Sequence, residues 1–176
     1  MYVNTEKKVA FIAHPRTASQ ATAKTLVDKL GFKLRMSHHV YGESPSSWTV
    51  FATVRNPFDL LVSWYYLEIS KTKHDELFET WLRKCVANPN EYIQRGLFFA
   101  LYQCTDVLHF ENLQEEFDQL MEKLDLPPTK ILLKNVSEKR EGRDFNTYYN
   151  PELTKLVMDR FGRTVRELDY SIPRRS

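Results

Sequence analysis

The amino-acid sequence predicts an α/β fold in which a short, mostly parallel sheet is flanked by helices. Short apolar segments at 8–13, 49–54 and 107–110 have the length and the composition of buried strands. Between them lie segments such as 113–124, whose apolar residues recur at the spacing of one helical face. Strands that alternate with helices form a parallel sheet, and such sheets bind ligands at the carboxyl ends of their strands.

Local signals place the helices. The first helix is expected over 19–30, where Gly31 suits the left-handed position that follows a helix. Asn56 and Pro57 are typical of a helix start, with Asn as N-cap and Pro in the first turn. No repeat or compositional boundary interrupts the chain, so we expect a single domain over 1–176. Further helices are expected over 75–87, over 92–103 and from Pro151 onward.

Composition indicates a globular domain with a substantial hydrophobic core and a small anionic ligand. The chain has 176 residues, of which 42% are hydrophobic, and its net charge of +2 is too small to indicate a nucleic-acid partner. Its polar beginning and short apolar runs lead us to expect neither a secretion signal nor a membrane partner. The isolated Cys85 and Cys104 suit reduced thiols in a cytoplasmic protein. Basic residues gather at 14–55 and 130–143, which suits a polyanionic ligand.

A polar turn over 14–18 joins the first of these strands to the first helix. In such a turn the N–H groups of the first helical residues and the positive end of the helix dipole face the ligand. Arg16 adds a cation, and Thr17, Ser19 and Thr22 add hydroxyl donors. The two glycines and the Gly-Lys-Ser/Thr ending of a Walker A loop are not in the sequence. The turn therefore predicts a phosphate site without the ATP signature.

A second anion site is predicted where the strand 49–54 ends. Arg55 follows that strand directly, and Ser63 lies about two helical turns along the next helix. Together they are able to hold a phosphate, the Arg through a bidentate pair and the Ser as a neutral donor. Two other interpretations stay open: an ion pair between Arg55 and Asp59, and a hydrogen bond from Ser63 to its own helix.

Several motifs, in order along nearly the whole chain, resemble those of the sulfotransferase family. Residues 14–20 (His-Pro-Arg-Thr-Ala-Ser-Gln) are similar to its 5′-phosphosulfate loop. Residues 53–65, which include Arg55-Asn56-Pro57 and Ser63, are similar to its 3′-phosphate motif. Residues 110–113 (Phe-Glu-Asn-Leu) resemble a downstream segment, and the C-terminal pattern of the carbohydrate sulfotransferase branch is resembled by 135–137, 148–153 and 168–170.

The resemblance implies a P-loop-NTPase-like three-layer fold that binds 3′-phosphoadenosine 5′-phosphosulfate. By in-line transfer its sulfuryl group would pass to a hydroxyl or amine of a small-molecule or carbohydrate acceptor, leaving adenosine 3′,5′-bisphosphate, with no metal required. Arg55 and Ser63 would hold the 3′-phosphate, and a basic residue of the late loop, Arg143 or Arg140, would also contact the donor. The 5′-phosphosulfate would be held by Arg16, Thr17, Ala18, Ser19, Gln20, Ala21 and Thr22.

Two residues depart from the family pattern. The family usually has Lys where this chain has Arg16, and Arg neutralises charge on the bridging oxygen but does not readily give up a proton. Glycine is common at the position of Ala18, so we expect the loop to keep backbone angles that a Cβ tolerates. Both departures leave room for a weak or altered enzyme.

The group that takes the acceptor proton is expected in the polar loop 37–47. His38 and His39 lie in this loop, and an unperturbed histidine pKa near 6.5 suits a general base. Because adjacent residues seldom both point inward, we expect one of the two to act and favour His39, with Glu43 in reserve. A packing or donor role is expected for His14, and structural roles are expected for His74 and His109.

Two further functions compete with sulfuryl transfer. A P-loop kinase of nucleotides or small molecules needs a Walker lysine, magnesium and a strand-end aspartate, none of which the sequence has in place. A non-catalytic module that binds adenosine bisphosphate stays open, because Arg16 replaces the usual Lys and the base has more than one candidate.

Overall fold

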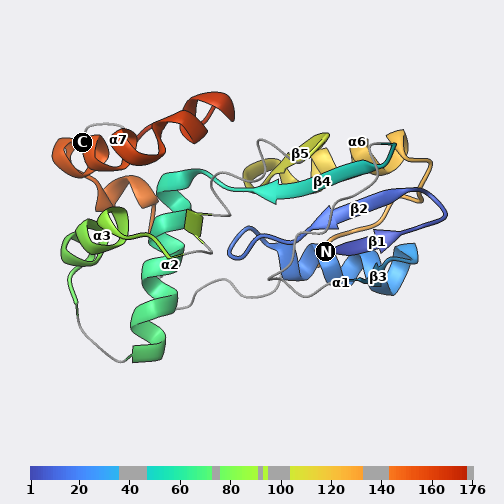
Figure 1. The fold of residues 1–176 in the computed structure, drawn as a ribbon, viewed down its shortest axis with the longest axis horizontal. Helices are drawn as coiled ribbons and strands as arrows, with labels where there is room; N and C mark the ends of the chain where they lie inside the picture. Colours follow the sequence, from blue (N-terminus) through green and yellow to red (C-terminus); the bar gives the residue numbers. More distant parts are fainter. Residues whose placement is uncertain (36–46, 73–75, 91–92, 95–103, 133–142, 174–176) are drawn as a thin grey trace. The chain divides into compact units, whose positions relative to one another are not determined.

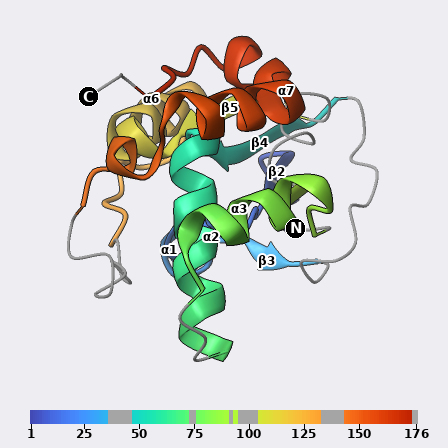
Figure 2. The same ribbon diagram turned by 90° about the vertical axis from the view of Figure 1, so that its left-hand side faces the viewer.

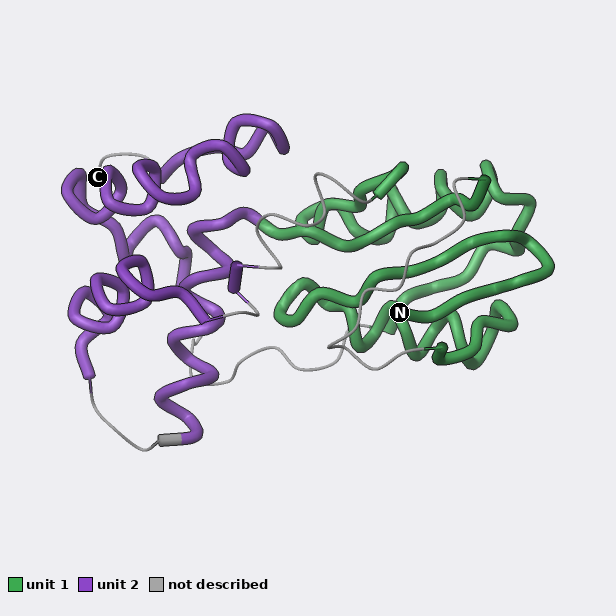
Figure 3. The backbone as a smooth tube through the Cα atoms, in the orientation of Figure 1, with its two compact units in different colours: residues 1–55, 102–134 green, residues 56–101, 135–176 purple. Residues whose placement is uncertain are grey.

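The structure is a computed structural model that describes residues 1–35, 47–72, 76–90, 93–94, 104–132 and 143–173 (Figure 1). The chain divides into two compact units, each built from two separate stretches (Figure 3). Unit 1 comprises 1–55 and 102–134, and unit 2 comprises 56–101 and 135–176. Each unit has its own hydrophobic core. The expected single domain over 1–176 stays a prediction.

Unit 1 contains a five-stranded mixed sheet with the order β3-β1-β2-β4-β5. Its strands are β1 (Tyr2–Asn4), β2 (Val9–Ile12), β3 (Lys33–Leu34), β4 (Thr49–Val54) and β5 (Asp106–His109). The neighbours β2, β4 and β5 are parallel, whereas β1 pairs antiparallel with both β2 and β3. The predicted α/β class with a mostly parallel sheet centre is therefore confirmed.

The sequence predicts both ends of β2, β4 and β5 to within one residue, but it does not predict β1 and β3. All four residues of β2 are buried, which explains its continuous apolar run. By contrast, β1 and β3 are only three and two residues long. A strand that short has no measurable alternation, so its existence depends on pairing with strands elsewhere in the chain.

One face of the sheet is covered by α1 (Ser19–Leu30) and α6 (Leu113–Lys123). Phe11 of β2 pairs with Phe51 of β4, and Leu108 of β5 lies on the same face, two residues beyond Asp106, the β5 partner of Phe51. These side chains share one cluster with Leu26 of α1 and Phe117 of α6. The apolar faces of both helices therefore pack against this face of the sheet.

The parallel register brings three chain segments to one edge of this sheet. Ile12 pairs with Ala52, and Val54 pairs with His109, so β2, β4 and β5 all end toward the same side. The turn before α1, Arg55 and Phe110 each follow directly after one of these strands. This carboxyl edge is where the sequence places the phosphate site.

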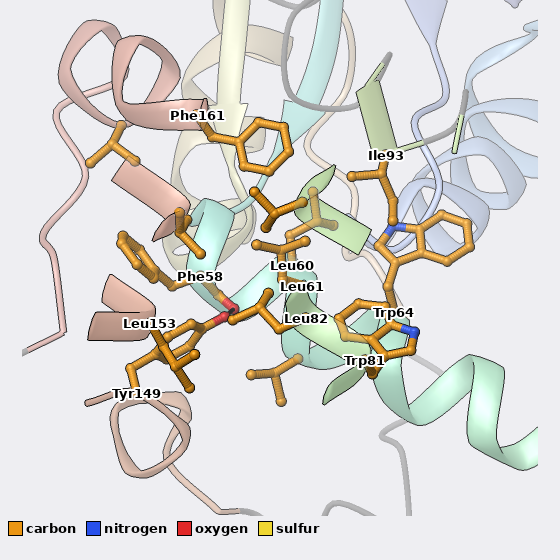
Figure 4. Packing of buried hydrophobic residues seen from close by; sticks show 14 residues of the cluster. Phe58, Leu60, Leu61, Trp64, Trp81, Leu82, Ile93, Tyr149, Leu153 and Phe161 are labelled. Carbon is orange, nitrogen blue, oxygen red and sulfur yellow. Dashed lines mark hydrogen bonds between the residues drawn. The ribbon is translucent and has the colours of Figure 1, made fainter. Parts of the chain in front are cut away.

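The described part of unit 2 includes the helices α2 (Pro57–Thr72), α3 (Phe78–Ala87), η3 (Phe145–Tyr148) and α7 (Pro151–Glu167). The helices α3 and α7 pack against α2 and against each other (Figure 2). Figure 4 shows their shared core, in which the Phe58 and Tyr149 rings meet edge to face at 5.0 Å. The other labelled residues of this core are Leu60, Leu61, Trp64, Trp81, Leu82, Ile93, Leu153 and Phe161.

Predicted helix signals are confirmed in both units. Gly31 adopts the left-handed φ of 71° after α1, and its N–H donates to the carbonyl of Leu26. Asn56 accepts a hydrogen bond from the Phe58 N–H at 3.0 Å, as an N-cap does. Of the helix expected over 92–103, only residues 93–94 belong to the described chain. In the described ranges, no helix has both the length and the apolar content that crossing a bilayer requires.

Candidate functional site

The turn between β2 and α1 has an unusual backbone. Arg16 has a φ of 69° and Ala18 a φ of 60°, so two non-glycine residues, separated by Thr17, are left-handed. Left-handed residues that alternate with ordinary ones direct successive N–H groups to one side, which is a known way of building an anion-binding concavity. Ala18 therefore does not keep the angles that suit a Cβ, which corrects the sequence expectation. Non-glycine residues in this region cost free energy and tend to mark functional sites.

The positive end of the α1 helix dipole is not offset by a capping side chain or an acidic first-turn residue among the described residues. Ala18 occupies the N-cap position, and no side chain caps it within the described part of the chain. The first turn of α1 also carries no acidic residue, whereas the first turns of α2, α3, α6 and α7 each carry at least one. The first N–H groups of a helix have no carbonyl partner inside the helix. The start of α1 is therefore favourable for a bound anion.

Arg16 and Arg55 meet at this edge of unit 1. The Arg55 guanidinium donates from Nη1 to the carbonyl oxygen of Arg16 at 3.1 Å. Its Cζ also lies 4.3 Å from the centre of the Phe110 ring. Burial lowers the pKa of Arg16, and the positive charge of Arg55 lowers it further. Two cations that disfavour one another in a partly buried place are stabilised by an anion between them.

Two of the predicted hydroxyl donors bind the chain itself in this structure. Buried Thr17 donates to the carbonyl of His14 at 2.8 Å, and it lies 2.7 Å from the hydroxyl of Thr53. A hydroxyl has one proton, and Thr17 donates its proton to His14, so Thr53 is the donor in the hydrogen bond between Thr17 and Thr53. This bond connects the turn to β4. Thr22 donates to the carbonyl of Ala18 at 3.3 Å. Their role as ligand donors stays a prediction.

The other predicted residues of this segment lie in the first helical turns. Ser19 is buried and makes no side-chain hydrogen bond among the described residues, Gln20 is exposed, and Ala21 is half-buried. Ala21 has no polar side chain, so any contact that it makes with an anion uses its backbone N–H. The predicted segment 16–22 is thus a turn and a helix start that offer mainly backbone donors, together with the Arg16 charge.

Two histidines of unit 1 have structural surroundings. His14 is fully buried, and burial, followed by the positive charge of the N-terminus, lowers its pKa from 6.5 to about 4. It is therefore neutral at pH 7. His109 places Nδ1 3.1 Å from both carboxylate oxygens of Glu116, which also accepts the His109 backbone N–H. Glu116 thereby ties α6 to β5, in keeping with the structural role expected of His109.

The remaining predicted site residues belong to unit 2 or lie outside the described residues. Ser63 lies in α2 and is buried, and Arg143 is exposed shortly before η3. Ser63 and Arg55 belong to different units, so their shared phosphate stays a prediction, as does the alternative ion pair of Arg55 with Asp59. The residues outside the described ranges are His38, His39, Glu43, His74 and Arg140.

Sequence reasoning missed the contact between Phe110 and Arg55. The segment 110–113 carries a signal, because it resembles a sulfotransferase motif, but its spacing from Arg55 does not reveal the contact. Likewise, Glu116 is one of several acidic residues near the start of α6, and only the fold pairs it with His109. The contact between Phe110 and Arg55 depends on the register of β4 beside β5, and the contact between Glu116 and His109 depends on the packing of α6 beside β5.

In the described part of the chain, potential metal ligands form no cluster and both thiols have raised pKa values. Among the described residues, no group of three or more His, Cys, Asp or Glu side chains is arranged to hold a metal ion. Cys85 and Cys104 are free thiols, and burial raises the pKa of each to about 12. The expected metal independence stays a prediction. Comparison of the chain with protein-family models, curated proteins and solved structures finds no match.

Proposed function

We propose that this chain is a sulfotransferase that uses 3′-phosphoadenosine 5′-phosphosulfate to sulfate a hydroxyl or amine of a small-molecule or carbohydrate acceptor. The observation that carries the proposal is the pair of arginines, Arg16 and Arg55, beside the uncapped start of α1. Two cations and a row of helix N–H groups suit a ligand with several negative charges. A P-loop-NTPase-like arrangement and a cytoplasmic location belong to the same proposal.

In this proposal the turn and the first residues of α1 bind the 5′-phosphosulfate. Transfer breaks the bond between sulfur and the bridging oxygen and forms a bond between sulfur and the acceptor oxygen or nitrogen. Arg16 neutralises the negative charge that builds on the bridging oxygen as it leaves with the 5′-phosphate. Arg55 and Ser63 bind the 3′-phosphate, Arg143 adds a contact, and the acceptor proton passes to His39 or His38.

The arginine pair also supports a non-catalytic module that binds adenosine 3′,5′-bisphosphate. An anion site formed by Arg16, Arg55 and helix N–H groups needs no base in order to bind. The two functions differ only in turnover, so a binding measurement must be followed by an activity measurement. No described residue favours the kinase alternative.

Calorimetry and a turnover assay test the proposal together. Adenosine 3′,5′-bisphosphate should bind in the presence of a metal chelator, and ATP with Mg²⁺ should bind more weakly. The sulfated donor should then be consumed in the presence of sugar, phenol or amine acceptors. Binding without turnover on any of them would favour the non-catalytic module. Tight binding of ATP with Mg²⁺, and none of adenosine 3′,5′-bisphosphate, would overturn the proposal.

A further inference from the structure

The ring of Phe110 contacts the guanidinium of Arg55. Phe110 directly follows β5, begins the short helix η1 (Phe110–Asn112) and is half-buried. Instead of lying wholly in the core, its ring lies 4.3 Å from the Cζ of Arg55. The face of an aromatic ring is negative, so it attracts a guanidinium placed over it.

Arg55 is therefore held on two sides. The Phe110 ring packs against the Arg55 guanidinium, and the carbonyl of Arg16 accepts a hydrogen bond from an Arg55 N–H at 3.1 Å. Both contacts place negative potential against a cation that otherwise faces the like charge of Arg16. A guanidinium has five N–H donors in a fixed planar arrangement, so the orientation of its plane decides where those donors point.

The chain beneath Phe110 is itself anchored. The backbone N–H of His109, the residue before it, donates to Glu116 of α6 at 2.5 Å, and the His109 ring contacts the same carboxylate. The strand β5 is also in register with β4, with Val54 beside His109. Phe110 and Arg55 follow these two paired residues, so the contact between them joins two fixed points of the backbone.

We propose that Phe110 is a positioning residue for the anion site: its ring fixes the Arg55 guanidinium in the orientation that binds a phosphate group and offsets the repulsion from Arg16. The proposal rests on the function proposed above, and names the residue that prepares the site for its anionic ligand. A long side chain that is already ordered loses less conformational entropy on binding than one that is free. Removal of the ring should therefore weaken anion binding through Arg55.

Phe110→Leu, Phe110→Tyr and Arg55→Met form the test, with Phe117→Leu as a matched control. Phe117 is a fully buried residue of α6 in the unit 1 core, so its truncation reports loss of packing alone. Phe110→Leu should weaken the affinity for adenosine 3′,5′-bisphosphate roughly threefold to thirtyfold in calorimetry. Phe110→Tyr should restore it, and Phe117→Leu should lower the melting temperature while leaving the affinity unchanged.

The double variant separates positioning from a merely structural role. If Phe110 acts through Arg55, Phe110→Leu should cause no further loss of affinity in a protein that already carries Arg55→Met. An equal loss in both backgrounds, or wild-type affinity in Phe110→Leu, would overturn the inference. Inorganic pyrophosphate is a second probe: if wild type binds it but not adenosine 3′,5′-bisphosphate, the proposed function fails while the same cycle still tests Phe110. If wild type binds neither, both proposals fail.

Discussion

At the scale of single residues, substitution of Arg16 tests whether the proposed site is catalytic or only binds. It is a half-buried cation in the turn before α1, next to Arg55. A cation beside the leaving oxygen stabilises the transition state more than the bound donor. The rate therefore separates the two functions better than affinity does.

Arg16→Ala should reduce the turnover number far more than it weakens donor binding. If the proposed function is right, Arg16→Lys should keep substantial activity, because Lys supplies the same charge and is the usual residue at this position in the sulfotransferases that the sequence resembles. Steady-state kinetics with the sulfated donor measure the rate, and calorimetry with adenosine 3′,5′-bisphosphate measures the affinity. An unchanged rate and affinity in Arg16→Ala would place the phosphate site elsewhere. A wild type that binds without turnover, and gains activity as Arg16→Lys, would identify a lapsed catalyst.

His14 makes a separate residue-scale prediction about pH. Its pKa is about 4 in the folded protein and near 6.5 when unfolded, so between these values the unfolded chain binds a proton that the native state does not. The free energy of unfolding should therefore fall, by up to about 3 kcal/mol, as the pH drops from about 6.5 to 4. Urea unfolding at pH 7, 6 and 5 measures this fall. It should be smaller in His14→Gln, and parallel curves for the two proteins would contradict the assignment.

At the scale of elements, the entry into α1 combines strain with an open helix start. Ala18 has a left-handed φ of 60° and occupies the N-cap position without a capping side chain. Glycine is better than alanine on both counts, because it has no Cβ to oppose a positive φ and because it is a favoured N-cap residue. The strain is localised in the same turn that carries Arg16.

Ala18→Gly should raise the free energy of unfolding by roughly 1 kcal/mol, since relief of the left-handed strain outweighs the added entropy of the unfolded chain. Urea unfolding at pH 7 measures the change. Ala21→Gly is the matched control, because Ala21 lies inside α1 and the same substitution there should cost about 1 kcal/mol. If both variants lose stability to the same extent, Ala18 is not strained in solution.

At the scale of the whole molecule, the proposed function draws on both units. The turn, Arg16 and Arg55 belong to unit 1, whereas Ser63 lies in α2 of unit 2. Each unit has a separate hydrophobic core, so the effect of a ligand is best measured in each unit separately. Local opening of a protein is reported by amide hydrogen exchange.

Hydrogen exchange should therefore show which units take part in binding. Adenosine 3′,5′-bisphosphate, at 100 times its Kd, should slow the exchange of amides in 14–22 by up to about 100-fold. If Ser63 binds the 3′-phosphate, the amides of the first turns of α2 should be protected as well. Pyrophosphate, which has no nucleoside, should protect unit 1 alone. Protection confined to unit 1 with both ligands would exclude Ser63 as a ligand residue.

Local patterns in the sequence determine much of the secondary structure. The apolar runs predict β2 and β4, Gly31 marks the end of α1, and α7 begins at Pro151 after the N-cap Asn150. Each signal depends on neighbours within a few residues, which is why it is readable without the fold. The polar turn after β2 is also predictable from local sequence, since a strand, a turn and a helix follow one another directly in the chain.

Only the tertiary structure decides how the site is assembled. Arg55 reaches the carbonyl of Arg16 across 39 positions of sequence, and Thr17 bonds Thr53 across 36. Phe110 meets Arg55 because β5 lies beside β4 in parallel register. The left-handed angle of Ala18 contradicts the backbone preference of alanine, so the residue type does not predict it. These contacts depend on strand pairing between distant segments, and no local pattern of residue types specifies such pairing.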